Sequence, residues 1–139
     1  MSIDMNIEVI VIHAAYGDED NPKLVAIVES PHVSKDEGMT DEDHLEYAYR
    51  WTQNIQGSWS RGADNNPDYN WRVKKMQANE VIDGKTYGQR STSVGDYMSL
   101  SDATGNIRRY RVAGVGFERV GEDFFWDKFK HLFDPKGVM

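Results

Sequence analysis

Apolar residues near the start of the chain predict a β-hairpin. Residues 7–14 are β-branched and almost continuously apolar, which is typical of a central strand covered on both faces. The turn-forming cluster 17–22 separates this run from a second apolar run at 24–29. We expect residues 30–32 to stop the second strand after residue 29, because Pro31 cannot donate a backbone hydrogen bond to a neighbouring strand.

Two segments have the spacing of amphipathic helices. Thr40 can accept a hydrogen bond from an early backbone N–H, so we expect a helix at 41–55 directly after it. The segment 121–134 carries an apolar stripe with the i, i+4, i+7, i+8 spacing of a second helix. The members of this stripe are Phe125, Phe129, Leu132 and Phe133.

The middle of the chain predicts a long loop followed by strands. Residues 56–70 are polar, and a loop of this length in a compact domain is often functional. Alternating polar and apolar positions predict a strand at 71–76. Further strands are predicted at 95–101, 107–114 and 115–120. This order of elements indicates a single α+β domain, residues 1–139, in which two main helices pack against an antiparallel sheet or small open barrel.

Composition and charge limit the classes of function. The chain has a mean hydropathy of -0.69 and no apolar run of the roughly 20 residues that cross a bilayer. Its start lacks the features of a signal peptide, so we expect a cytoplasmic protein without a membrane partner. With zero cysteines, a disulfide framework, a thiolate zinc site and a cysteine nucleophile are excluded.

The net charge of -7 is unevenly distributed along the chain. Residues 1–49 hold 12 acidic and 2 basic residues, a charge of -10, whereas residues 50–139 hold 11 and 14, a charge of +3. Such a division could create opposed surface potentials. We expect instead that the charges interleave in the folded domain, because halves of a sequence rarely map onto separate faces.

Motifs for catalysis or metal binding are incomplete in this sequence. The four histidines show no HxH or HxxxH spacing. The Asx-rich stretch 64–70 resembles the start of a calcium loop. Such a loop, counted from Asp64, needs glycine at its sixth position and glutamate at its twelfth, where this sequence has Tyr69 and Lys75. Ser60 lacks the preceding strand and glycine of a nucleophile elbow. We therefore predict no catalytic residues, no metal site and no cofactor.

A mixture of aromatic and basic residues in the segment 50–75 is the first candidate for binding. Aromatic rings beside cations are how proteins hold single-stranded nucleic acids. The candidates are Trp59, Arg61, Trp71 and Arg72, with Trp59 expected to be exposed on its loop. A core lined by tryptophan and tyrosine would explain the same residues, and the negative charge of the chain opposes binding to phosphates.

Residues 88–120 carry a family-like signature. The matching residues are Arg90, Ser91, Ser93, Val94, Gly95 and Asp96, then Tyr110, Val112, Gly116 and Phe117. They resemble the RS-x-SVGD … YxVxxxGF segment of small bacteriophage and mobile-element proteins, including YodL-like and polyvalent-protein-associated domains. Residues 47–60 look like the T-N-x-I-x-x-S-W segment of phage-borne relatives. The resemblance covers less than half the chain and implies a phage or mobile-element origin with a non-enzymatic accessory role.

Six further residues are candidate binding residues, each with a structural alternative. Arg90, Ser91 and Ser93 either cap neighbouring backbone groups or form a binding rim. Asp41, Glu42 and Asp43 either stabilise the start of a helix or belong to an acidic binding surface.

The leading hypothesis is a phage-encoded binding protein that targets a host protein in the host cytoplasm, as a host-takeover or counter-defence inhibitor. Carboxylates at 18–20, 36–37 and 41–46 could mimic the phosphates of a nucleic acid. An alternative is a nucleic-acid-binding accessory protein that uses 50–75. A further alternative is a virion-associated structural protein, which would form homo-oligomers through the aromatic C-terminal helix.

Overall fold

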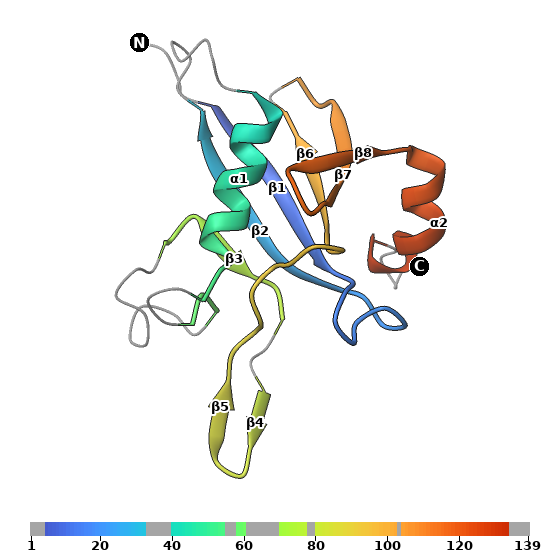
Figure 1. Cartoon of the computed structure of the whole chain (residues 1–139). Helices are drawn as coiled ribbons and strands as arrows, with labels where there is room; N and C mark the ends of the chain where they lie inside the picture. The colour runs from blue at the N-terminus through green and yellow to red at the C-terminus, as the bar shows by residue number, and fades with distance from the viewer. Residues whose placement is uncertain are drawn as a thin grey trace.

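An open, antiparallel six-stranded sheet with strand order β3-β2-β1-β6-β7-β8 forms the centre of the computed structural model (Figure 1). The structure describes residues 5–32, 40–54, 58–60, 70–77, 80–102 and 104–133. The strands of the sheet are β1 (Met5–His13), β2 (Lys23–His32), β3 (Val73–Lys75), β6 (Tyr97–Ser101), β7 (Ile107–Val112) and β8 (Phe117–Val120). The helices are α1 (Asp41–Trp51) and α2 (Glu122–Phe133). The predicted α+β class with an open antiparallel sheet is confirmed.

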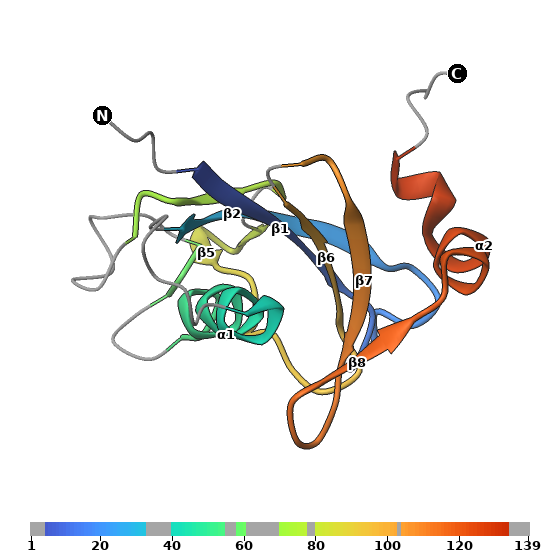
Figure 2. The same cartoon turned by 90° about the horizontal axis from the view of Figure 1, so that it is seen from above.

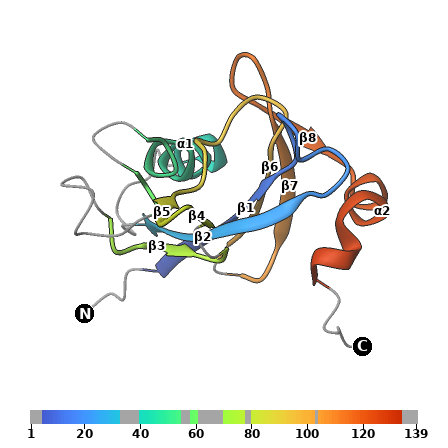
Figure 3. The ribbon, with the colours of Figure 1, turned by 90° about the horizontal axis from the view of Figure 1, so that it is seen from below.

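Strand β1 is central and buried on both faces, as its sequence predicts. Val9 and Val11 belong to the core cluster that also contains Leu45 of α1. Ile12 points to the opposite face, where it packs with Phe125 of α2. The alternation along β1 thus places the two helices on opposite faces of the sheet. Figures 2 and 3 show β6, β7 and β8 lying between α1 and α2.

The prediction that residues 30–32 stop the second strand after residue 29 is wrong, because β2 continues through Pro31 to His32 and pairs with β1 over this length. Glu29 donates its backbone N–H to Arg72, towards the β3 side of the sheet. Residues two apart in a strand direct their backbone nitrogens to the same side, so the nitrogen of Pro31 faces the same edge. Strand β3 pairs only with residues 26–28, and the missing N–H of Pro31 therefore breaks no bond to it.

Helix α1 begins after Thr40, as predicted, but the predicted end at residue 55 is wrong. Two side-chain contacts explain the earlier end at 51. Thr52 donates its hydroxyl to Ala48, and the backbone N–H of Asn54 bonds to the hydroxyl of Ser91 in place of a helical carbonyl. A contact with a distant loop therefore ends the helix.

A short hairpin, β4 (Glu80–Ile82) with β5 (Lys85–Tyr87), was not predicted from the sequence. Its two-residue turn, Asp83-Gly84, has φ values of 52° and 79°. Asp-Gly is a strong signal for such a turn, and the sequence interpretation overlooked it. The hairpin projects from the body of the protein (Figure 1). The first predicted strand begins two residues earlier than expected, and the strands predicted at 71–76, 95–101, 107–114 and 115–120 are present with slightly shorter bounds.

Candidate functional site

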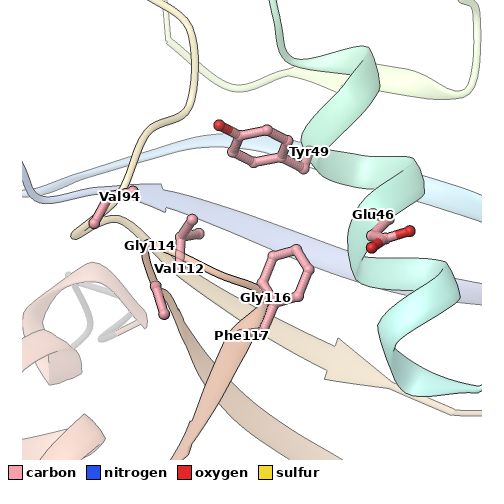
Figure 4. Close-up of a pocket in the computed structure, with 8 residues that line it drawn as sticks. Glu46, Tyr49, Val94, Val112, Gly114, Gly116 and Phe117 are labelled. Atoms are coloured by element: carbon pink, nitrogen blue, oxygen red, sulfur yellow. The ribbon is translucent and has the colours of Figure 1, made fainter.

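Among the described residues, a pocket with a mixed lining lies between α1 and the β7–β8 hairpin, and we call it the α1 pocket. It has a volume of about 320 Å³, at the lower end of the range for ligand pockets. Its lining residues are Glu46, Tyr49, Val94, Val112, Ala113, Gly114, Gly116 and Phe117. Figure 4 shows the rings of Tyr49 and Phe117 at the pocket, with Val94 opposite the helix and Glu46 on α1.

The shape of the pocket follows from local structure. The rings of Tyr49 and Phe117 meet edge to face, with their centroids 6.4 Å apart. The turn between β7 and β8 closes with a hydrogen bond from the Ala113 N–H to the Gly116 carbonyl. Gly116 has a φ of 72°, which favours glycine. Val115, at the tip of this turn, is 95% exposed and places an apolar side chain beside the pocket.

Carboxylates of α1 form one rim of the pocket. Glu42, Glu46 and Tyr49 share a helix face, because their spacing is i, i+4, i+7. A methyl group on Gly116 would lie 3.8 Å from Glu42 Oε2, which places this carboxylate at the pocket. Among the described residues, neither Glu42 nor Glu46 has a salt-bridge partner. We call Glu42, Asp43 and Glu46 the acidic edge.

The other two acidic candidates of this helix have structural partners. Asp41 accepts hydrogen bonds from Arg108, at 2.9 Å to Nη2, and from the Tyr110 hydroxyl. The Arg108 hydrogen bonds hold the pKa of Asp41 below its usual value, against the effect of burial. Asp43 completes a capping box with Thr40, since each accepts a hydrogen bond from the other's backbone N–H. Asp43 remains an exposed carboxylate, whereas the charge of Asp41 is neutralised.

The expectation that Trp59 is exposed is wrong. Trp59 is 5% exposed and packs in the core cluster beneath α1. Its indole N–H donates to the carbonyl of Arg90, and its backbone N–H donates to the side chain of Asn54. These bonds satisfy the polar groups that a buried tryptophan brings into the core. Trp59 therefore has no free face for a nucleic-acid base, and Arg61 lies outside the described residues.

The remaining aromatic and basic candidates lie together at the surface. Trp71 is 64% exposed, and the guanidinium of Arg72 lies 4.6 Å from its ring centroid. Tyr47 of α1 links this segment to the helix, because its hydroxyl accepts a hydrogen bond from Asn70. The ring of Tyr47 in turn contacts Trp51, over which Arg50 stacks at 4.1 Å. Two guanidinium–indole stacks thus lie near one another.

Arg90, Ser91 and Ser93 cap neighbouring groups, which was the structural alternative in their sequence interpretation. Arg90 donates to both oxygens of Asp96, at 2.8 Å each, and to the carbonyl of Ala15. The Ser91 hydroxyl accepts the N–H at the end of α1, and the Ser93 N–H donates to Asp96. These groups are engaged within the fold, and a binding rim formed by them stays a prediction.

Asp96 is the centre of this network and was missed as a functional candidate. Its side chain is inaccessible and also accepts the backbone N–H groups of Ala14 and Ala15. Burial by itself would raise the pKa of Asp96, but the hydrogen bonds from Arg90 and the backbone hold it below its usual value. The preceding Gly95 has a φ of 97°, and a Cβ there would lie 3.1 Å from that of Ala15. The Gly-Asp pair of the signature is thus explained by folding.

Two hydroxyl–imidazole pairs were also missed, because their members are far apart in the sequence. His13 Nε2 lies 3.0 Å from the Thr92 hydroxyl, and His44 Nδ1 lies 2.8 Å from the Ser30 hydroxyl. Such pairs can activate a nucleophile. All four side chains are buried, so neither hydroxyl is open to a substrate in this structure.

Among the described residues, no group of three or more His, Asp or Glu side chains is arranged to hold a metal ion. Neither helix in this part of the chain is long and apolar enough to span a bilayer.

Charges from the two parts of the sequence interleave in three ion pairs, as expected. Each joins a carboxylate from residues 1–49 to a cation from residues 50–139. The pairs are Asp18–Arg90, Glu29–Lys74 and Asp41–Arg108. The acidic edge remains without such a partner among the described residues, and the carboxylates at 36–37 lie outside them.

Comparison with known proteins found no match to a family model, a curated protein or a solved structure. The resemblance of residues 88–120 and 47–60 to phage proteins therefore stays a prediction. The α1 pocket is the candidate site on the strength of its own geometry. Its apolar floor, two aromatic rings and carboxylate rim are brought together from α1 and the β7–β8 hairpin.

Proposed function

We propose that this chain is a small, non-enzymatic binding protein of a bacteriophage or related mobile element, which docks on a basic site of a host protein in the host cytoplasm. The observation that carries the proposal is the apolar α1 pocket bounded by the carboxylates of Glu42 and Glu46, which have no ion-pair partner in the described part of the chain. A surface of this kind combines apolar contact with charge that steers a cationic partner. The phage origin rests on the sequence resemblance alone.

The proposed mode of binding is mimicry of a nucleic acid by the acidic edge. A host enzyme that binds phosphates presents a basic groove, and negative charge on a rigid helix can occupy such a groove. The acidic edge lies on one helix whose start is fixed by the Thr40–Asp43 capping box. This arrangement supports inhibition of a defence or nucleic-acid-processing protein by occupation of its basic site.

Binding to a heptalysine peptide tests the proposal, with fluorescence anisotropy as the measurement. We expect affinity that falls as salt rises and that weakens by roughly two- to thirtyfold in Glu42→Gln/Glu46→Gln, since exposed charge pairs contribute about 0.2–1 kcal/mol each. Asp123→Asn/Asp127→Asn is the matched control, because it removes two exposed carboxylates from α2. Equal weakening in both double variants would contradict a role for the acidic edge.

The same variants serve to find the partner. We expect the target to be a host protein that the wild type and the control Asp123→Asn/Asp127→Asn both retain from bacterial lysate. Glu42→Gln/Glu46→Gln should not retain it. Retention by all three proteins would mean that the captured protein binds elsewhere.

A second candidate function is binding of single-stranded nucleic acid, which the exposed Trp71–Arg72 stack beside Arg50 and Trp51 favours. In this case a labelled oligonucleotide binds in a salt-sensitive way, and Trp71→Ala weakens it by about tenfold, as expected for loss of one stacked base. Phe124→Ala removes an exposed ring of α2 and is the control. Binding of the oligonucleotide that Trp71→Ala leaves unchanged would argue against this function.

A further inference from the structure

We infer that the α1 pocket receives the side chain of a single lysine or arginine from the partner, with its alkyl stem on Tyr49 and Phe117 and its charge at Glu46 and Glu42. This inference rests on the proposed function and adds the chemical group that the pocket recognises. A ligand of this pocket needs both an apolar stem and a positive charge. A flat acidic surface would need only the positive charge.

The lining of the pocket matches the two parts of such a side chain. Val94, Val112 and Phe117 offer apolar surface on the sheet side, where methylene groups can replace water. The rings of Tyr49 and Phe117 present π systems, which attract cations within about 6 Å. Lysine and arginine bury their stems on apolar surface while the charged head stays near water.

The carboxylates lie where the charged head would emerge. Glu46 lines the pocket and is exposed, and Glu42 Oε2 lies close to Gly116 on the opposite wall. A cation between them would gain an exposed ion pair on one or both sides. An anionic ligand would meet two like charges in the same place, so the charge of the rim selects against it.

Among the described residues, the arginines near the α1 pocket do not already place a cation in it. Arg108 is engaged by Asp41 and Asp102. Arg119 lies over the ring of Tyr110, with its guanidinium carbon 5.8 Å from the centroid. Neither lines the α1 pocket, so its aromatic rings remain available to a cation from outside.

The volume also suits one side chain better than a larger ligand. About 320 Å³ is close to the smallest pockets that enclose a small ligand, for which the range is roughly 300–1,000 Å³. The fully exposed Val115 beside the pocket provides apolar contact for the residues that flank the inserted side chain.

Titration of the full chain with three blocked amino acids, followed by NMR, tests the inference. Nα-acetyl-lysine methylamide carries the stem and the charge, the norleucine analogue carries a stem alone, and the 2,4-diaminobutyrate analogue carries the charge on a short stem. We expect saturable shifts of Tyr49, Gly116 and Phe117 with the lysine compound, and affinities weaker by about two- to fivefold or more with the other two.

Two variants give an independent readout. Phe117→Leu keeps an apolar residue on β8 but removes the ring, so it should reduce affinity for the lysine compound by about two- to fivefold. Phe124→Leu makes the same change on an exposed residue of α2 and should have no effect. Amide spectra of both variants show directly whether the fold is retained, and Glu46→Gln, at an exposed position, tests the charge without touching the core.

The outcomes separate this inference from the proposed function. Equal binding of the norleucine compound, or equal binding by Phe117→Leu and Phe124→Leu, would overturn the inference. If heptalysine binding depends on Glu42 and Glu46 while the lysine compound leaves Tyr49 and Phe117 unshifted, the acidic edge acts without the pocket and only the inference fails. If the lysine compound enters the pocket but heptalysine binding is unchanged in Glu42→Gln/Glu46→Gln, the proposed function fails.

Discussion

The imidazole of His13 is enclosed at the end of β1, between the hydroxyl of Thr92 and the carboxylate of Asp96. Its Nε2 lies 3.0 Å from Thr92 Oγ1 and 4.0 Å from Asp96 Oδ2. Thr92 donates in turn to Thr52 at the end of α1. The buried side chain of His13 therefore connects β1 to the 90–96 loop and, through Thr92, to the end of α1.

Protonation of His13 should destabilise the protein in mild acid. Burial lowers its pKa from 6.5 to about 4, while the charge of Asp96 acts in the opposite direction. Between these two pH values the unfolded chain binds a proton that the folded chain does not. This contribution to stability is complete above about pH 6.5 and is lost as the pH falls towards 4, by roughly 3 kcal/mol.

Urea unfolding at a series of pH values from 4 to 7 measures this effect. We expect His13→Gln to be less stable than the wild type at neutral pH but to show a flatter decline in free energy of unfolding between pH 6.5 and 4. His131→Gln, on the exposed end of α2, shows what removal of a histidine does elsewhere. Parallel declines in His13→Gln and the wild type would contradict the assignment to His13.

Residue identity alone could not reveal this network. The signature residues Arg90, Ser93, Gly95 and Asp96 are conspicuous in the sequence, but their partners Ala14 and Ala15 offer only backbone groups. A backbone N–H has no sequence signal, so the sequence favoured capping of backbone groups by these residues but could not identify the groups that they cap.

At the scale of elements, α2 is held to the sheet by a buried arginine of β7. Arg109 is 5% exposed and donates to the Ser99 hydroxyl at 2.5 Å and to Glu122 at 2.9 Å. Its guanidinium also lies 4.2 Å from the ring centroid of Phe125 and 5.0 Å from that of Trp126. One side chain thus contacts the first turn of the helix through charge and through aromatic rings.

Replacing this arginine should loosen α2 selectively. We expect Arg109→Met to lower the free energy of unfolding by about 1–3 kcal/mol, since a partly desolvated cation–π contact and charged hydrogen bonds are lost. Hydrogen exchange should accelerate in α2 more than in β1 and β2. Arg111→Met removes the more exposed pair with Glu118 and should cost about 0–1 kcal/mol. Equal effects of the two variants would contradict a special role for Arg109.

The apolar stripe of α2 illustrates what an element's sequence predicts. Phe125 and Phe129 are buried as the spacing indicates, but against the chain's own sheet. The stripe is therefore used within the fold, while Phe124 and Trp126 remain the exposed rings of this helix. Self-assembly through this helix stays a prediction, which would now depend on these two residues.

At the scale of the whole molecule, the sheet brings the candidate site together from distant segments. Glu46 and Tyr49 come from α1, Val94 from the loop before β6, and Phe117 from β8. The acidic residues of α1 were identified as candidates from the sequence. In the folded protein, those nearest the start of the helix have different surroundings. Asp41 pairs with Arg108, whereas Glu42 has no ion-pair partner among the residues that the structure describes and lies close to Gly116 at the pocket.

The sequence by itself determined the types of the main elements, because strand and helix periods are local and survive in any tertiary context. The nearly continuous apolar run of β1 and the stripe of α2 are of this kind. Only the tertiary structure decided which aromatic residues are buried and which charges stay unpaired. Trp59 and Trp71 are the same residue type, but Trp59 is buried in the core beside α1, whereas Trp71 is mostly exposed and is contacted by Arg72. Their burial differs because it depends on neighbours that only the folded chain supplies.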